Sequence, residues 1–209
     1  MNQKRAPRGA SVMEWGVAAL TMPGEEVSGD LHLVEPFPKG ALVAVVDGLG
    51  HGPEAAVAAR NAVETLKAHP DESVITLVNR CHENLRPTRG VVLGMAVFNT
   101  VDGTMTWLGV GNVDGILFRN DSEGKNAYEA LISRRGVVGG RLPPLHAAIL
   151  PVTHGDTLIF VTDGISTGFD SNLKTDRSPK VIADQILAQH NLGTDDALVL
   201  VGRYVGNAK

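Results

Sequence analysis

The chain has little of several features that other classes of protein require. Cys81 is the only cysteine in 209 residues, so no disulfide can form within the chain and no thiolate zinc site is available. This cysteine content predicts a reducing compartment, the cytoplasm. Cys81 lies on the apolar stripe of an expected helix, which favours a core residue over a reactive thiol.

Long apolar runs and a dominant charge are also absent. Purely apolar runs such as 41–46 are far shorter than the roughly 20 residues that a membrane-spanning helix needs. The basic start, residues 1–8, is followed by an apolar stretch broken by Glu14, which makes a poor signal peptide. A net charge of −4 without a Lys/Arg stripe argues against general nucleic-acid binding. We therefore expect neither a membrane protein nor a nucleic-acid-binding protein.

The composition that remains is that of an ordinary globular protein. Apolar residues make up 43% of the chain and charged residues 20%. No repeat and no low-complexity linker divides the sequence. We expect a flexible basic tail over residues 1–12 and a single domain over residues 13–209.

Hydrophobic patterning predicts many strands and a few helices. Apolar or alternating stretches bounded by Gly, Pro and Asp predict strands at 30–34, 41–46, 91–98, 104–110, 113–118, 128–132, 147–152, 157–162 and 197–201. Helical periodicity predicts one helix from Pro53 to His69, a second one capped by Asp71 and reaching Leu85, and a third one after Ser178. Helices in separate blocks among antiparallel strands predict an α+β fold. The preferred architecture is a four-layer α-β-β-α sandwich of two packed, mostly antiparallel sheets flanked by helices.

Aspartates stand at the ends of several predicted strands. Asp47 and Asp163 directly follow buried strands, and each precedes a glycine, whereas Asp30 and the pair Asp195-Asp196 precede strands. In antiparallel neighbours the end of one strand lies beside the start of the next. We therefore expect these carboxylates to share one edge of a sheet.

A cluster of this kind points to a metal site. Carboxylates held close together repel one another unless a cation or a proton intervenes. An all-oxygen ligand set favours Mg²⁺ or Mn²⁺ over zinc, and Gly48 allows close approach of a backbone carbonyl that could itself bind metal. The alternative is that each Asp-Gly pair only terminates a turn. Agreement of the strand polarity at every position favours the metal site.

Five short motifs, in order, carry a resemblance to a known family. They are Ser28-Gly29-Asp30, Asp47-Gly48-Leu49-Gly50-His51-Gly52, Gly109-Val110-Gly111-Asn112, Thr162-Asp163-Gly164-Ile165 and Thr194-Asp195-Asp196-Ala197-Leu198-Val199. The ordered set covers nearly the whole chain and resembles the PPM (type 2C) metal-dependent protein phosphatases, in particular the SpoIIE-like branch.

The resemblance implies an activity and a set of roles. The activity is hydrolysis of phosphoserine or phosphothreonine with two divalent ions, Mn²⁺ or Mg²⁺. Asp47 would bridge both ions, the Gly48 carbonyl would bind the first, Asp30 would stand near it, and Asp163 and Asp195 would bind the second. Asp47 and Asp163 would act in catalysis through a water whose pKa the two ions lower.

The resemblance also implies a partner. A short chain of this branch is similar to phosphatases that reset a bacterial stress-signalling complex, the stressosome, which makes a phosphorylated scaffold protein the expected substrate. Arg134 and Arg135 are the nearest basic candidates for contacting it. Asp196 is expected to orient Asp195 rather than to bind metal.

The chain departs from the family pattern at two places. Larger relatives carry a proposed general acid, a histidine, two residues after the bridging aspartate, where this chain has Leu49. His51, displaced by two, is the candidate acid here. The arginine that grips phosphate in many relatives has no match. Two other functions stay open: a non-catalytic phosphoprotein-binding module of the same fold, and a phosphoesterase for a small metabolite.

Overall fold

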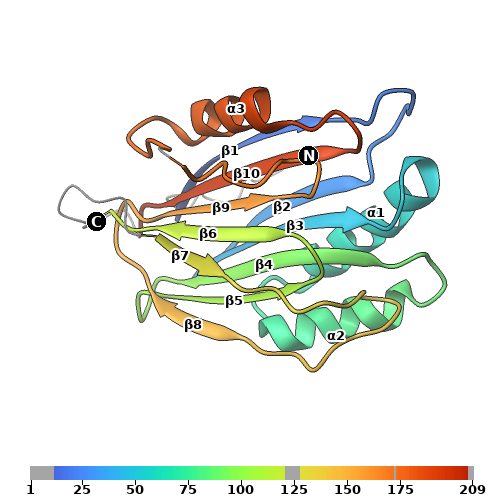
Figure 1. Cartoon of the computed structure of the whole chain (residues 1–209). Helices are drawn as coiled ribbons and strands as arrows, with labels where there is room; N and C mark the ends of the chain where they lie inside the picture. The colour runs from blue at the N-terminus through green and yellow to red at the C-terminus, as the bar shows by residue number, and fades with distance from the viewer. Residues whose placement is uncertain (1–11, 121–127, 172, 207–209) are drawn as a thin grey trace, which may run out of the picture.

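Two five-stranded antiparallel sheets pack face to face, and helices cover their outer faces (Figure 1). The computed structural model describes residues 12–120, 128–171 and 173–206. The first sheet, called the β1 sheet, has the order β1 (Met13–Leu20), β10 (Ala197–Tyr204), β9 (Thr157–Val161), β6 (Asp114–Phe118), β7 (Tyr128–Leu131). The second, called the β2 sheet, has the order β2 (Asp30–Phe37), β3 (Gly40–Gly48), β4 (Val91–Asn99), β5 (Thr104–Val110), β8 (Ala148–Pro151).

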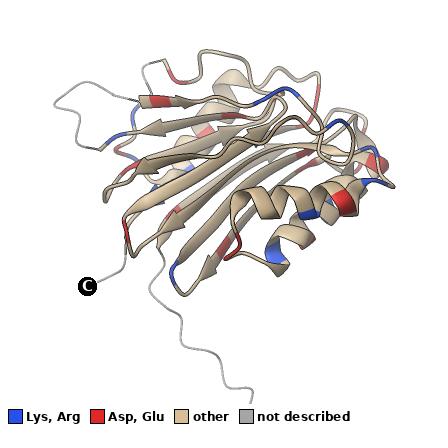
Figure 2. Cartoon of the chain, turned by 90° about the horizontal axis from the view of Figure 1, so that it is seen from below, with Lys and Arg blue, Asp and Glu red and all other residues tan. Residues whose placement is uncertain are grey.

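The helices lie on opposite sides of the sandwich. Helices α1 (Gly52–Ala68) and α2 (Val74–Leu85) contact the β2 sheet, and α3 (Pro179–His190) contacts β1 and β10 of the other sheet. The predicted four-layer α-β-β-α sandwich is therefore confirmed. Lys and Arg residues alternate with Asp and Glu residues over the helices and loops seen in Figure 2, in keeping with the absence of a basic stripe from the sequence.

Three apolar layers hold the four structural layers together. Phe98 and Phe160 are fully buried between the two sheets, Leu42 and Leu77 lie between the β2 sheet and its helices, and Ile182 lies between α3 and the β1 sheet. Strand β3 contributes to two of these layers, with alternate residues of 41–46 facing each way. A strand buried on both faces explains why this stretch is continuously apolar instead of alternating.

All nine predicted strands are present, and one strand was missed. Strand β1 lies at an edge of its sheet, and Glu14 and Trp15 are exposed, so its sequence lacks a regular alternation. Val12, the last residue of the predicted tail, is buried and its carbonyl accepts a hydrogen bond from Val205 N, at 2.9 Å. Any tail therefore ends before Val12; residues 1–11 lie outside the described residues.

The cap predicted for the second helix was wrong by two residues. Ser73, not Asp71, is the N-cap of α2, and its hydroxyl accepts from Thr76 N at 3.2 Å. Both residue types favour this position, and the one nearer to the first helical turn takes it. Cys81 is buried in the layer beneath α1 as predicted, and burial raises the pKa of its thiol to about 12. No helix within the described ranges is long and apolar enough to cross a membrane.

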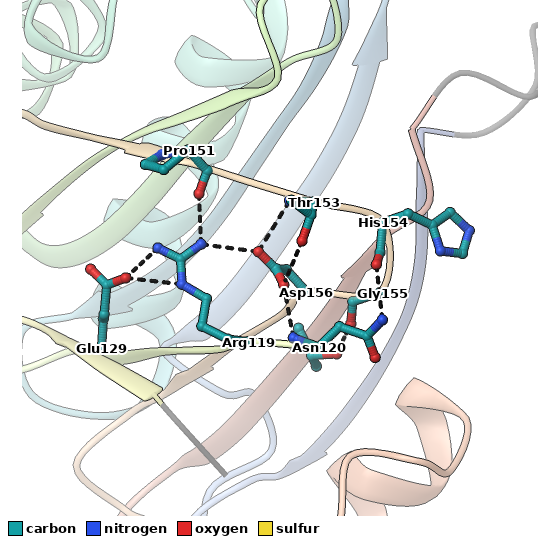
Figure 3. A network of polar contacts seen from close by, with 9 residues as sticks. Arg119, Asn120, Glu129, Pro151, Thr153, His154, Gly155 and Asp156 are labelled. Atoms are coloured by element: carbon teal, nitrogen blue, oxygen red, sulfur yellow. Dashed lines mark hydrogen bonds and ion pairs between the residues drawn. The ribbon is translucent and has the colours of Figure 1, made fainter. Parts of the chain in front are cut away.

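Arg119 fastens the two sheets at the end where β6 stops and β9 starts. Its guanidinium pairs with Glu129 of β7 and donates to Asp156, at 3.0 Å, and to the carbonyl of Pro151, at 2.6 Å (Figure 3). Pro151 belongs to the β2 sheet, so the contacts join both sheets. Asp156 is buried and also accepts from Asn120 N at 2.9 Å.

We predict that Arg119→Ala lowers stability without impairing the activity of the folded protein. The substitution leaves Asp156 buried without its ion-pair partner, at a cost of about 3 kcal/mol in the free energy of unfolding. Urea unfolding monitored by circular dichroism measures the loss. A stability equal to that of the wild type would contradict the role of Arg119 as a fastener.

Candidate metal centre

Four aspartates meet at the end of the sandwich opposite to Arg119. Asp30, the first residue of β2, is the register partner of Asp47 near the end of β3. Asp163 follows β9 and Asp195 precedes β10, and these two strands are antiparallel neighbours. Pairing of strand starts with strand ends therefore holds in each sheet, as predicted.

The expectation that one sheet edge would carry all the carboxylates was wrong. Asp30 and Asp47 belong to the β2 sheet, whereas Asp163 and Asp195 lie beside strands of the β1 sheet. Thr162 joins the two sets: its hydroxyl donates to Asp30 Oδ2 at 2.7 Å and accepts from Leu198 N at 2.8 Å. Face-to-face packing of the sheets, which a strand-by-strand interpretation does not specify, brings the sets together.

Gly48 lets helix α1 begin directly beside Asp47. A Cβ atom on Gly48 would lie 2.2 Å from the carbonyl oxygen of Ala55, so no larger residue fits without moving α1. Gly48 N donates to the carbonyl of Gly29 at 3.1 Å, which ties the end of β3 to the segment before Asp30. The predicted ligand segment is thus packed between α1 and the start of β2.

Burial and mutual repulsion make Asp30 and Asp47 hard to ionise. The pKa of Asp47 is raised to about 8, first by burial and then by the charges of Asp30, Asp163, Asp195 and Asp196. With a pKa of about 8, the Asp47 carboxyl group is mostly protonated at neutral pH, and a cation at this position would have to displace that proton.

Two of the carboxyl groups are held by hydrogen bonds that oppose this effect. Burial raises the pKa of Asp30 to about 7, although the Thr162 hydrogen bond lowers it. Burial and Asp195 also raise the pKa of Asp163, against a hydrogen bond from Asn112 Nδ2 at 2.6 Å. Neither Thr162 nor Asn112 had been given a role from the sequence, although both lie within the quoted motifs.

Asp196 has a different task from its neighbour. Its side-chain oxygens accept from Met22 N at 2.8 Å and from Gly29 N at 2.7 Å, and so fasten both ends of the loop between β1 and β2. Its backbone N–H donates to Asp195 Oδ1 at 2.8 Å. This contact agrees with the expectation that Asp196 orients Asp195, but it is made by the backbone.

His51 lies four residues after Asp47, at the start of α1. It is the N-cap residue of α1, its side chain is 55% exposed, and its Nδ1 lies 2.5 Å from Glu25 Oε1. Sequence analysis missed Glu25, because nothing in a run of two glutamates distinguishes the one that folds back onto α1. Near His51, the side chain of Arg89 lies over Gly50 and forms an ion pair with Glu54.

Arg134 lies beside the last residues of β5, at the end of the sheet where the aspartates lie. Its backbone exchanges hydrogen bonds with Gly109 O at 3.1 Å and Gly111 N at 2.8 Å, next to Asn112. Arg134 and Arg135 line a groove between the edge strands β7 and β8.

The donor set fits a hard divalent cation in its chemistry. It consists of carboxylates with backbone carbonyls close by, without a thiolate or an imidazole among the predicted ligands. As the side chains stand, no three His, Cys, Asp or Glu side chains among the described residues are placed to hold an ion. A cation held by these four carboxylates would have to draw them closer together.

Comparison with known proteins identifies the family. Residues 38–204 match the family model described as stage II sporulation protein E (SpoIIE). The chain belongs to the SpoIIE family. This confirms the phosphatase family predicted from the five motifs.

The relatives are similar along most of their length. Phosphoserine phosphatase RsbX of Bacillus subtilis (strain 168) is 25% identical over 188 residues, which cover 90% of this chain and 92% of RsbX. A structure from work on the bacterial stressosome is 26% identical, with a TM-score of 0.83 over 91% of this chain and 99% of the other. A crystal structure of RsbX with magnesium has a TM-score of 0.81 at 22% identity, covering 97% and 99%.

We predict that Asp47→Asn stabilises the metal-free protein at alkaline pH. Folded Asp47 keeps its proton to a pKa of about 8, whereas its ordinary value is 3.8, so stability falls as pH rises between these values. Asparagine cannot ionise and escapes this penalty. In chelator, the melting temperature of the variant should exceed that of the wild type at about pH 8.5, and the difference should shrink towards about pH 5. Exposed Asp71→Asn is the matched control, and an equal gain there would refute the interpretation.

Proposed function

We propose that this chain is a metal-dependent phosphatase that hydrolyses phosphoserine or phosphothreonine on a partner protein. The observation that carries the proposal is the approach of four aspartates, two from each sheet, at the junction of the sheets, where the pKa values of Asp30 and Asp47 are raised, in a chain of the SpoIIE family. Groups of this kind are costly to ionise without a cation. The burial of Asp30 and the charges around Asp47 favour this interpretation over four independent turn-ending aspartates.

The proposed ligands divide between the two sheets. Asp47 would bridge two ions, the Gly48 carbonyl and Asp30 would serve the first, and Asp163 and Asp195 the second. When bound, divalent ions of this kind supply a water of lowered pKa and positive charge opposite the phosphoryl oxygens. Mg²⁺ and Mn²⁺ both suit these oxygen ligands, and the similar RsbX structure contains magnesium.

The remaining residues would keep the ligands in place. Thr162 holds Asp30, Asn112 holds Asp163, and the backbone of Asp196 holds Asp195. The hydrogen bonds from Thr162 and Asn112 favour the charged forms of Asp30 and Asp163. The chain thus contributes carboxylate oxygens that are fixed in position.

The proposed partner is a phosphorylated scaffold protein of a stress-signalling complex. Support comes from the 25% identity to RsbX, which is named a phosphoserine phosphatase, and from similarity to the structure from work on the stressosome. A cytoplasmic location is part of the proposal, and it rests on the cysteine content.

The proposed docking surface is the groove between β7 and β8. Arg134 and Arg135 line it, together with Trp107 and the highly exposed Ile132. The backbone bonds of Arg134 to Gly109 and Gly111 support a position of one end of this groove near Asn112, which donates to the proposed ligand Asp163. A phosphorylated segment lying there would meet positive charge before it reaches the carboxylates.

The first prediction tests the phosphatase activity itself. Hydrolysis of phosphoserine and phosphothreonine peptides should be lost in chelator and return with Mn²⁺ or Mg²⁺. Asp47→Asn and Asp163→Asn should reduce the rate to that of the metal-free protein, because each removes a charged ligand oxygen. Asp71→Asn is the control on the helix side of the molecule. Full activity in chelator, or near-normal activity of either ligand variant, would contradict the two-metal site.

A second prediction tests the docking surface. Reversing both charges, with Arg134→Glu and Arg135→Glu together, should lower kcat/KM on a phosphorylated protein by about tenfold, because charge contacts mainly speed encounter. Hydrolysis of 4-nitrophenyl phosphate in the same preparation should barely change. An unchanged ratio of the two rates would remove these arginines from the docking surface.

A further inference from the structure

We propose that Glu25 is a positioning residue that holds the His51 imidazole so that His51 Nε2 protonates the leaving oxygen of the substrate. The proposal rests on the phosphatase function proposed above. It assigns the proton donor that the family pattern leaves open at Leu49, and it adds a residue from a separate loop to the site.

The contact itself sets the tautomer of the ring. His51 Nδ1 lies 2.5 Å from Glu25 Oε1, and the Glu25 side chain is 25% exposed. A carboxylate can only accept hydrogen bonds, so Nδ1 carries the hydrogen in this pair. Nε2 is then the ring atom that points away from Glu25 and can exchange a proton with another group.

The same carboxyl group lies against the start of α1. Gly52 has a φ of +74°, and a Cβ atom there would lie 2.6 Å from Glu25 Oε2. A side chain at position 52 would therefore push the Glu25 carboxyl group aside. Negative charge at this position is also favoured by the N-terminal end of the α1 dipole.

The loop that carries Glu25 is fastened to the metal centre. Asp196 accepts from Met22 N and Gly29 N, on either side of Glu25, and Glu25 N donates to Met22 O at 3.1 Å. The backbone of Asp196 in turn holds Asp195. One residue thus couples the position of Glu25 to that of a proposed metal ligand.

His51 is close to the chemistry along the chain and through the fold. It follows Asp47 by four residues, in a turn whose next helix packs against Gly48. The other charged groups beside this turn, Glu54 of α1 and Arg89 of the loop before β4, pair with each other. Glu25 is therefore the carboxylate that contacts the His51 imidazole.

The proton transfer balances without a further reactant. Water attacks phosphorus, the bond from phosphorus to the serine or threonine oxygen breaks, and that oxygen takes the proton from Nε2 of protonated His51. The inorganic phosphate keeps the hydrogens of the attacking water and then releases one to solvent. The ring becomes neutral, and its remaining hydrogen stays on Nδ1, which donates to Glu25. Solvent returns the proton before the next turnover, because the ring is half exposed.

Kinetics separate a positioning role from mere support of the loop. A general acid contributes about 10²–10⁴-fold when the leaving group is a poor one, so Glu25→Ala should slow a phosphoserine peptide by about 10–10²-fold in kcat. With 4-nitrophenyl phosphate, whose leaving group departs without a proton, the loss should be under about threefold. Glu25→Asp should restore part of the loss, and the matched control, exposed Glu26→Ala, should behave as the wild type.

An independent readout does not need activity. Nitrogen-15 shifts of the His51 ring, measured on the full chain, should show the Nδ1–H tautomer in the wild type and in Glu26→Ala, and a mixture in Glu25→Ala. Equal slowing of both substrates, no slowing of either, or an unchanged tautomer in Glu25→Ala would each overturn the proposal. A wild type that hydrolyses no phosphoester with either metal would instead overturn the phosphatase function, whereas the tautomer would still report on the pair.

Discussion

Repulsion among carboxylates at the junction of the two sheets is the constraint on which the rest of this structure depends. Buried Asp30 and partly buried Asp47 are register partners in the β2 sheet, and Asp163 and Asp195 approach them from the other sheet. Like charges at this junction oppose the packing of the two sheets unless protons or cations neutralise them. Stability and metal binding are therefore linked at one place.

Several contacts around the aspartates reduce the cost of that repulsion. Hydrogen bonds from Thr162 and Asn112 favour the charged carboxylates, and Gly48 admits the start of α1 beside Asp47. At the opposite end, Arg119 joins both sheets where no such conflict exists. The sandwich is thus held together by an ion pair at one end, whereas carboxylates repel one another at the other end.

Sequence periodicity was sufficient for most of the elements. The continuous apolar runs of β3 and β4 are local signals, since each depends on which faces a strand buries. Strand β1 was not predicted, because an edge strand with Glu14 and Trp15 exposed has no regular alternation of apolar and polar residues. The choice of Ser73 over Asp71 as a cap depends on where the first helical turn closes, which residue type alone does not decide.

By itself the sequence determined the aspartates, their places at strand starts and ends, and the family, because strand polarity and short motifs are local properties of the chain. Only the tertiary structure decided that these aspartates come from two sheets, since face-to-face packing joins residues as distant as Asp30 and Thr162. The same holds for the pairing of Glu25 with His51 and for the hold of Asp196 on the loop before Asp30. Those contacts depend on how loops fold back across the end of the sandwich, and the spacing of residues along the chain does not determine how the loops fold.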